Sequence, residues 1–184
     1  ITSFPAPERF LEEARMGLQI DTAEDLNHAP WMQAMLDILH KKAAAAVQLA
    51  ERCLVICEEP DGPNQYREQI ESDIEKLQAI GQADSYAAMK GAIESKWATL
   101  SRKKFTGDKE LQEACKTLRK EYKDEFDSKK LDSFKQSEAQ ILEDMQLLKT
   151  YLLPLLSLTE EFMTRFMEEK QKRKMLEFSD ISHM

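Results

Sequence analysis

Residues 31–59 read WMQAMLDILHKKAAAAVQLAERCLVICEE, and this stretch decides the fold. Its apolar residues recur every three or four positions over about seven turns, the spacing at which side chains share one face of an α-helix. The stripe consists of Met32, Leu36, Leu39, Ala43, Val47, Ala50, Leu54 and Cys57. The sequence therefore predicts one long amphipathic helix over 31–59.

The turn signal Glu59-Pro60-Asp61-Gly62-Pro63 ends this helix, because two prolines bracket an Asp-Gly pair that favours a turn. Apolar stripes of the same period predict further helices, with a polar connection over 21–30. The expected ranges are 7–17, 63–81, 85–100, 108–130 and 141–166. Pro154 either kinks the last helix or opens another. We therefore expect an all-α bundle of five to six helices.

Composition restricts the class of protein. The 184 residues carry 26 Lys and Arg against 34 Asp and Glu, with only five Gly and six Pro, which excludes a Gly/Pro-rich disordered chain. No run of 18 apolar residues and no signal-peptide pattern is present, so neither a membrane span nor a leader is expected. The sequence begins without Met and ends just after a helix start at Ser179-Asp180, which predicts an excised fragment.

Enzyme signatures are missing from the sequence. It contains no Walker-type phosphate loop, no Gly-x-Gly-x-x-Gly and no His-Glu-x-x-His, so no catalytic, cofactor-binding or metal residue is assigned. Cys53 and Cys57 lie one helical turn apart, a spacing compatible with two metal ligands. Because a second ligand pair is lacking, we interpret them as buried small side chains. The odd count of three cysteines, Cys115 included, indicates a reducing compartment.

Basic residues are concentrated in the stretch 102–135, although the whole chain is acidic. This stretch holds eleven Lys and Arg against eight acidic residues. On a helix over 108–130, drawn at about 100° per residue, six of the basic residues fall within one arc of about 100° beside the apolar stripe. The sequence predicts that this cationic face continues into the preceding basic loop. The predicted phosphate-contacting residues are Arg102, Lys103, Lys104, Lys116, Arg119, Lys120 and Lys123.

The sequence leaves two interpretations of the cationic face open. Lys and Arg contact nucleic-acid phosphates without reading the base sequence, and Phe105 beside the loop is suited to stack on a base. The alternative is a solvated helix face in which Glu113 pairs with Lys116 or Lys120. A second basic cluster over 170–174 fits phosphate contact and complementation of a helix C-terminus equally well.

The C-terminal stretch resembles a junction in UvrD-like superfamily 1 helicases. In those proteins a basic helix leads to an Asp-Phe-x-Asp-Leu-like sequence, where an inserted 1B subdomain returns to the ATP-binding 1A core. The corresponding residues here are Glu177-Phe178-Ser179-Asp180-Ile181. Further features resemble the AddA (or RexA) branch: the 59–63 turn with Tyr66, Trp97 before a basic loop, Leu118-Arg119-Lys120 with Lys123, and His183.

This resemblance implies that 1–184 is a single helical, 1B-like domain, with 177–184 beginning the return to the core. It implies a cytoplasmic parent chain that is an ATP- and Mg²⁺-dependent 3′-to-5′ DNA helicase and exonuclease of double-strand break repair and recombination. The fragment is expected to be non-catalytic, without a cofactor, and to contact the DNA backbone beside the motor. Further expected partners are the remaining helicase and nuclease domains and a second subunit of the AddB (RexB) type.

A helical protein-interaction module is the alternative function. It would dock a partner subunit through helix 31–59 and the apolar C-terminal run, and its binding would resist salt, whereas phosphate binding weakens steeply with salt. Under either function the apolar stripes are expected to be mostly buried. The expected core residues are Met32, Leu36, Leu39, Leu54, Leu118, Tyr122, Leu148, Leu155 and Phe162.

Overall fold

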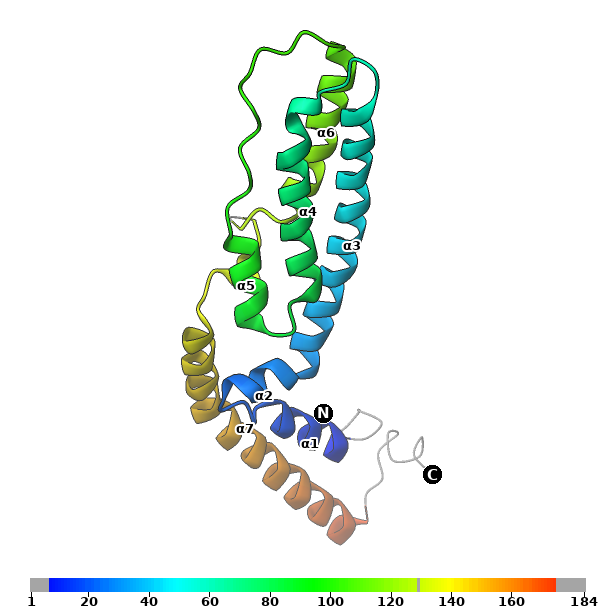
Figure 1. Cartoon of the computed structure of the whole chain (residues 1–184). Coiled ribbons are helices and arrows are strands. Elements are labelled where there is room, and N and C mark those ends of the chain that lie inside the picture. The colour runs from blue at the N-terminus through cyan, green and yellow to red at the C-terminus, as the bar shows by residue number, and fades with distance from the viewer. Residues whose placement is uncertain (1–6, 129, 175–184) are drawn as a thin grey trace. The chain divides into compact units, whose positions relative to one another are not determined.

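A computed structural model of the chain describes residues 7–128 and 130–174 (Figure 1). It confirms the all-α class, because these residues form helices and no strand. The elements are α1 (Pro7–Gly17), α2 (Ala23–His28), α3 (Pro30–Glu58), the 3₁₀ helix η1 (Asn64–Tyr66), α4 (Arg67–Gln82), α5 (Tyr86–Glu94), α6 (Lys109–Glu125), the 3₁₀ helix η2 (Asp132–Phe134) and α7 (Glu138–Arg173).

The chain divides into two compact units. Residues 30–138 form what we call the central unit, and the segments before and after them form the terminal unit. The assignment of 1–184 to one 1B-like domain stays a prediction. Its proposed return to the core, 177–184, lies outside the described residues, as do Glu177 to Ile181 and His183.

Helices α3, α4 and α6 lie side by side in the central unit (Figure 1). The predicted helix 31–59 is confirmed as α3, whose alanines leave room for a close neighbour. A β-carbon placed on Gly81 of α4 would lie 3.7 Å from the β-carbon of Ala43. Met32, Leu36 and Leu39 are buried as predicted, as is Tyr122 of α6, whereas Leu54 and Leu118 are half-buried.

The turn between α3 and α4 forms where the sequence signals it. Asp61 takes a positive φ of 62°, and the Gly62 amide donates to the Glu59 carbonyl at 2.8 Å. A β-carbon on Gly62 would lie 2.2 Å from the carbonyl oxygen of Ile56, so only glycine fits here. The sequence thus predicted both the place of this turn and the residues that make it.

The helix predicted over 85–100 ends earlier than expected. α5 stops at Glu94, where the amide of Ser95 donates to the carbonyl of Gly91 and the Ser95 hydroxyl donates to Ala92. Residues 96–108 then run without a helix to the start of α6 (Figure 1). Helical spacing of Trp97 and Leu100 misled the prediction, because contacts with α4 and α6 hold this segment extended.

The terminal unit contains α1, α2 and α7. Helix α2 was predicted as a polar connection, which is wrong: Thr22 and Asp25 form a capping box that starts it, with the Thr22 hydroxyl accepting from the Asp25 amide at 3.1 Å. Helix α7 continues through Pro154 as one unbroken ribbon (Figure 1). Arg15 of α1 pairs with Glu160 of α7 at 2.7 Å, and Lys149 pairs with Asp21.

Burial of α7 differs from the prediction. Leu148, Leu155 and Phe162 were expected in the core, yet they are 45%, 57% and 62% exposed. The stripe they form is real, but none of the described elements of the terminal unit, α1, α2 and α7, covers it. In the described part of the chain, no helix combines the length and apolar character that a membrane span requires.

Candidate nucleic-acid interface

The segment 95–108 carries the basic loop and is held at both ends. At its far end, the amide of Asp108 donates to the carbonyl of Asp61 at 2.8 Å, and the Asp108 side chain caps α6 by accepting from the Glu110 amide at 2.7 Å. A β-carbon on Gly107 would lie 2.3 Å from the Asp61 oxygen, so this approach requires glycine. The start of α6 is thereby fastened to the α3–α4 turn.

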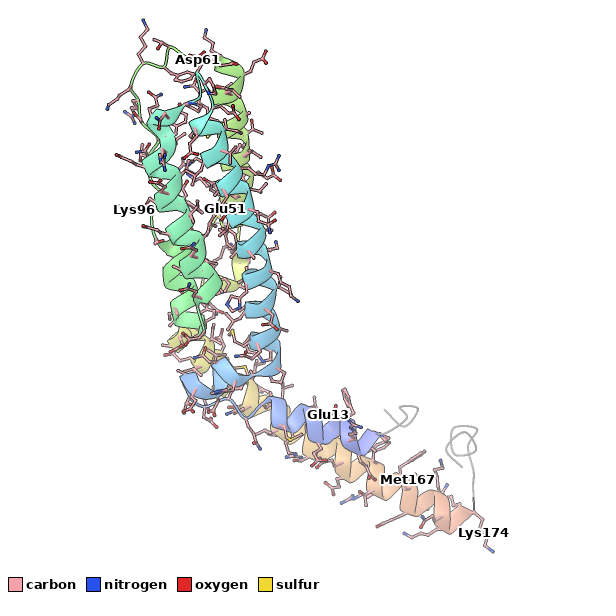
Figure 2. All side chains as sticks on the ribbon, turned by 45° about the vertical axis from the view of Figure 1, so that its right-hand side comes forward. Glu13, Glu51, Asp61, Lys96, Met167 and Lys174 are labelled. Carbon is pink, nitrogen blue, oxygen red and sulfur yellow. The ribbon has the colours of Figure 1, made fainter. Side chains whose placement is uncertain are left out.

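Lys76 of α4 holds the near end of the segment. Its ammonium donates to the Ile93 carbonyl at 2.8 Å, to the Ser95 hydroxyl at 3.0 Å and to the Ser95 carbonyl. The same ammonium lies 4.6 Å from the centre of the Trp97 ring. In Figure 2, Lys96 lies beside the middle of α4 and Asp61 lies at the end of the central unit. The segment therefore runs along α4 from the Lys76 anchor to the Asp61 anchor.

A buried ionic network joins α4, α6 and the segment. Arg119 of α6 donates to Asp73 of α4 through Nε at 2.6 Å and Nη2 at 3.1 Å, and Nη2 also donates to the Ala98 carbonyl at 2.5 Å. The Tyr122 hydroxyl donates to the same carboxylate at 2.8 Å. The charged groups of this cluster are therefore paired inside the central unit, as buried charges require.

Arg119 was predicted on the exposed cationic face, and this placement is wrong. The residue is 7% exposed, and Asp73 is 1% exposed. Burial works against the charged guanidinium, but the hydrogen bond and charge of Asp73 outweigh it and raise the pKa of Arg119. A signal for this pair existed in the sequence: Asp73 interrupts the apolar stripe of α4 between Ile70 and Leu77, and such a carboxylate needs a partner.

Three lysines of α6 form the part of the predicted face that solvent reaches, with Lys120 exposed and Lys116 and Lys123 half-buried. Lys116, Lys120 and Lys123 line a shallow cavity of about 250 Å³ together with Arg119, Leu100 and Asp124. Arg119 forms part of its wall rather than a free charge. The structure thus brings four of the seven predicted residues together, and it places Leu100 of the basic segment beside them.

The individual lysines differ in their freedom. Lys116 pairs with Glu113 at 2.7 Å, and this hydrogen bond raises its pKa. Lys123 is half-buried 5.6 Å from the centre of the Trp97 ring, and burial followed by the charge of Arg119 lowers its pKa. Lys120 is exposed. The cavity rim therefore presents ammonium groups that suit an anion such as a phosphate.

The other predicted residues lie on the segment itself. Arg102, Lys103 and Lys104 are exposed between the two anchors. Phe105 is half-buried, and its ring reaches within 2.7 Å of the position that a β-carbon on Gly107 would occupy. The segment therefore holds its charges outward while its aromatic ring covers its own backbone.

The cysteines meet in the core of the central unit. Cys53, Cys57 and Cys115 are buried, with 4.0 Å between the sulfurs of Cys57 and Cys115 and 3.5 Å from the Cys53 sulfur to the Cys115 carbonyl oxygen. Hydrogen bonding with Cys115 and burial raise the pKa of both Cys53 and Cys57. Across residues 7–128 and 130–174, no group of three or more His, Cys, Asp or Glu residues is arranged to hold a metal ion.

No protein-family model matches the chain. Three curated relatives match over 98% of it, and each is named as the A subunit of an ATP-dependent helicase/nuclease. The protein of Lachnoclostridium phytofermentans is 31% identical over 188 residues, that of Listeria monocytogenes serotype 4b is 26% identical over 185, and that of Desulforamulus reducens is 24% identical over 185. The chain belongs to this family of helicase/nuclease A subunits.

The match covers only one segment of these relatives. The chain spans 14% of the length of the Lachnoclostridium phytofermentans protein and 15% of the other two. The predicted AddA family is thus confirmed, and the chain corresponds to a piece of a helicase/nuclease A subunit.

Proposed function

We propose that this segment of a helicase/nuclease A subunit is a non-catalytic helical accessory subdomain, corresponding to 1B, that contacts the DNA backbone beside the motor of its parent protein. The observation that carries the proposal is the cavity rim formed by Lys116, Lys120 and Lys123, continued by Arg102 to Lys104 on an anchored segment. Ammonium and guanidinium groups neutralise phosphates without reading bases. Such a surface suits a motor that must engage DNA of any sequence.

Rigid support of the basic segment favours this proposal over a merely solvated face. Lys76, Arg119 and Asp61 fix the segment at its two ends. Because the path of the backbone is set before DNA binds, less conformational entropy is lost on binding. A face that only contacts solvent does not require a fixed backbone, so it does not account for the buried donors Lys76 and Arg119.

The parent chain is proposed to supply the catalysis. The names of the relatives give an ATP-dependent helicase and nuclease, from which we infer an ATP- and Mg²⁺-dependent 3′-to-5′ translocase with exonuclease activity in double-strand break repair and recombination. The proposed further partners are the remaining domains of the same chain and a second subunit of the AddB type. We propose the cytoplasm as its location.

Charge reversal in the full-length subunit tests the DNA contact. The variant Lys116→Glu with Lys120→Glu is expected to weaken binding to unrelated DNA sequences to a similar degree, because phosphate contacts carry no base information. The slope of log binding constant against log salt is expected to fall by roughly one unit for each phosphate that the variant no longer neutralises. Arg119 is left unchanged, so the interior network stays intact. Binding is measured by fluorescence anisotropy over a range of salt concentrations.

A matched control is available on α3. Lys41 and Arg52 are both exposed, and reversing them to glutamate changes the net charge by the same amount. This double variant is expected to retain the affinity and most of the salt slope of the unchanged protein. If the α6 variant also retained both, or if the two variants lost affinity equally, the cavity rim would be a solvated surface.

The alternative function, docking of a partner through α3 and the apolar C-terminal run, loses one of its two elements. The stripe of α3 is buried within the central unit, including Met32, Leu36 and Ala50. Of these two elements, α7 exposes a row of large apolar side chains from Leu148 to Phe162, whereas α3 exposes Trp31, Ile38 and Val55 far apart along its length.

A further inference from the structure

Helix α7 carries an exposed apolar seam. Its members are Leu148, Tyr151, Leu155, Leu158 and Phe162, which are between 45% and 68% exposed. Their spacing alternates between three and four residues, the a and d positions of a heptad. At 1.5 Å per residue this seam is about 21 Å long. Side chains of this size, aligned on one face, mark a surface that another element covers.

A second apolar stripe on α7 is already used within the terminal unit. Met145, Leu152, Leu156, Met163 and Phe166 are half-buried, and they lie on average about 90° around the helix from the seam. This side includes Lys149 and Glu160, which pair with Asp21 and with Arg15 of α1. Because apolar residues occupy two neighbouring faces, α7 has the pattern of a helix packed on two sides, of which the structure fills one.

We propose that the α7 seam is the docking surface for a helix from the part of the parent protein that lies outside these 184 residues. The match spans only 14% to 15% of the relatives, so most of such a protein is available as the occupant. The N-terminal segment 1–29 and the C-terminal segment 139–184 both belong to the terminal unit. Any adjoining sequence is therefore attached to the unit that bears the seam, at a high effective concentration that a separate molecule lacks.

The heptad spacing specifies the occupant further. Alternation of a and d positions accepts the side chains of a second helix as knobs into holes, rather than an extended peptide. Asp144 and Arg165 occupy the next positions of the same register at its two ends, so the apolar run is limited to Leu148 through Phe162. This inference does not depend on DNA contact by α6.

Thiol labelling in the full-length subunit tests whether the seam is covered. Leu158→Cys places a thiol in the seam, and Thr150→Cys places one on the exposed polar face. Both positions lie in one tryptic peptide, residues 150–165, which contains no other cysteine. Maleimide is expected to label Leu158→Cys at least about tenfold more slowly than Thr150→Cys, the effect of about 1.4 kcal/mol of protection. Equal labelling rates would overturn the proposal.

Photo-crosslinking identifies the occupant. With benzoylphenylalanine at position 158 of the same protein, we expect a crosslink to a peptide of the same polypeptide outside residues 1–184. Because this crosslink is intramolecular, the product is expected to keep the mass of one polypeptide rather than that of a dimer. The same residue at position 150 serves as the control and is expected to give no such product. A crosslink to residues 30–138, to a second copy or only to the added partner subunit would each contradict the proposal, since each names a different occupant.

Discussion

Helix α6 carries a charged side chain that is buried, whereas α7 carries large apolar side chains that are exposed. Arg119 of α6 stays inside because Asp73 and the Ala98 carbonyl accept its hydrogen bonds. Leu155 and Phe162 of α7 stay exposed, because no described element of their own unit covers them. Burial therefore follows the neighbours that a residue meets rather than its polarity alone. A paired charge is tolerated inside a domain, and an apolar stripe without a neighbour points to a missing one.

The strongest test of this contrast removes the buried arginine. Arg119→Ala is expected to lower the free energy of unfolding of the 184-residue chain by about 3–5 kcal/mol, because it leaves the Asp73 carboxylate buried with its positive partner gone. Urea unfolding followed by circular dichroism measures the change. The double variant with Asp73→Ala is expected to lose less than the sum of the two single losses, by about 0.5–3 kcal/mol. Strict additivity would mean that the pair is not coupled.

A pair of leucines sharpens the comparison. Leu77→Ala in α4 removes a fully buried side chain and is expected to cost about 2–5 kcal/mol. Leu155→Ala in α7 removes the same atoms from an exposed position and is expected to cost less than about 0.5 kcal/mol in the isolated chain. Thermal and urea unfolding of both variants report the difference. A large loss for Leu155→Ala would show that the seam is already covered within these residues.

Lys76 gives the smallest expected effect. Burial lowers its pKa from 10.5 to about 8, against the opposing influence of Asp73. Between pH 8 and 10.5 the unfolded chain therefore binds more protons at this lysine than the folded chain, so its contribution to stability rises with pH. Below pH 8 the lysine is charged in both states and the contribution is constant.

The variant Lys76→Met isolates this contribution. The difference in unfolding free energy, unchanged chain minus variant, is expected to grow from pH 8 to pH 10.5, by at most about 1.4 kcal/mol per pH unit. Urea unfolding at several pH values measures it. A difference that stays flat or shrinks over this range would show that Lys76 keeps its ordinary pKa. The same substitution is also expected to loosen the segment after α5, because it removes the hydrogen bonds from Lys76 to Ile93 and Ser95.

The sequence alone determined the helical class, the long helix α3 and the turn at 59–63. These features rest on local physics: the 3.6-residue period, the conformations of Pro and Gly, and capping. The Thr22–Asp25 capping box is a local signal in the sequence that marks the start of α2. The prediction of a polar connection over these residues overlooked it. The AddA resemblance, carried by the order of short motifs, was likewise available from the residues alone.

The tertiary structure decided which side of each stripe is buried. Arg119 and Lys120 are neighbours in sequence, yet one meets Asp73 of α4 and the other meets solvent. Trp97 and Leu100 have helical spacing, yet contacts with Lys76 and Arg119 hold their segment extended. Leu155 belongs to a regular heptad seam that no described residue of its own unit covers. A periodic pattern fixes which side chains share a face, but only the elements packed against that face determine whether it is core, interface or surface.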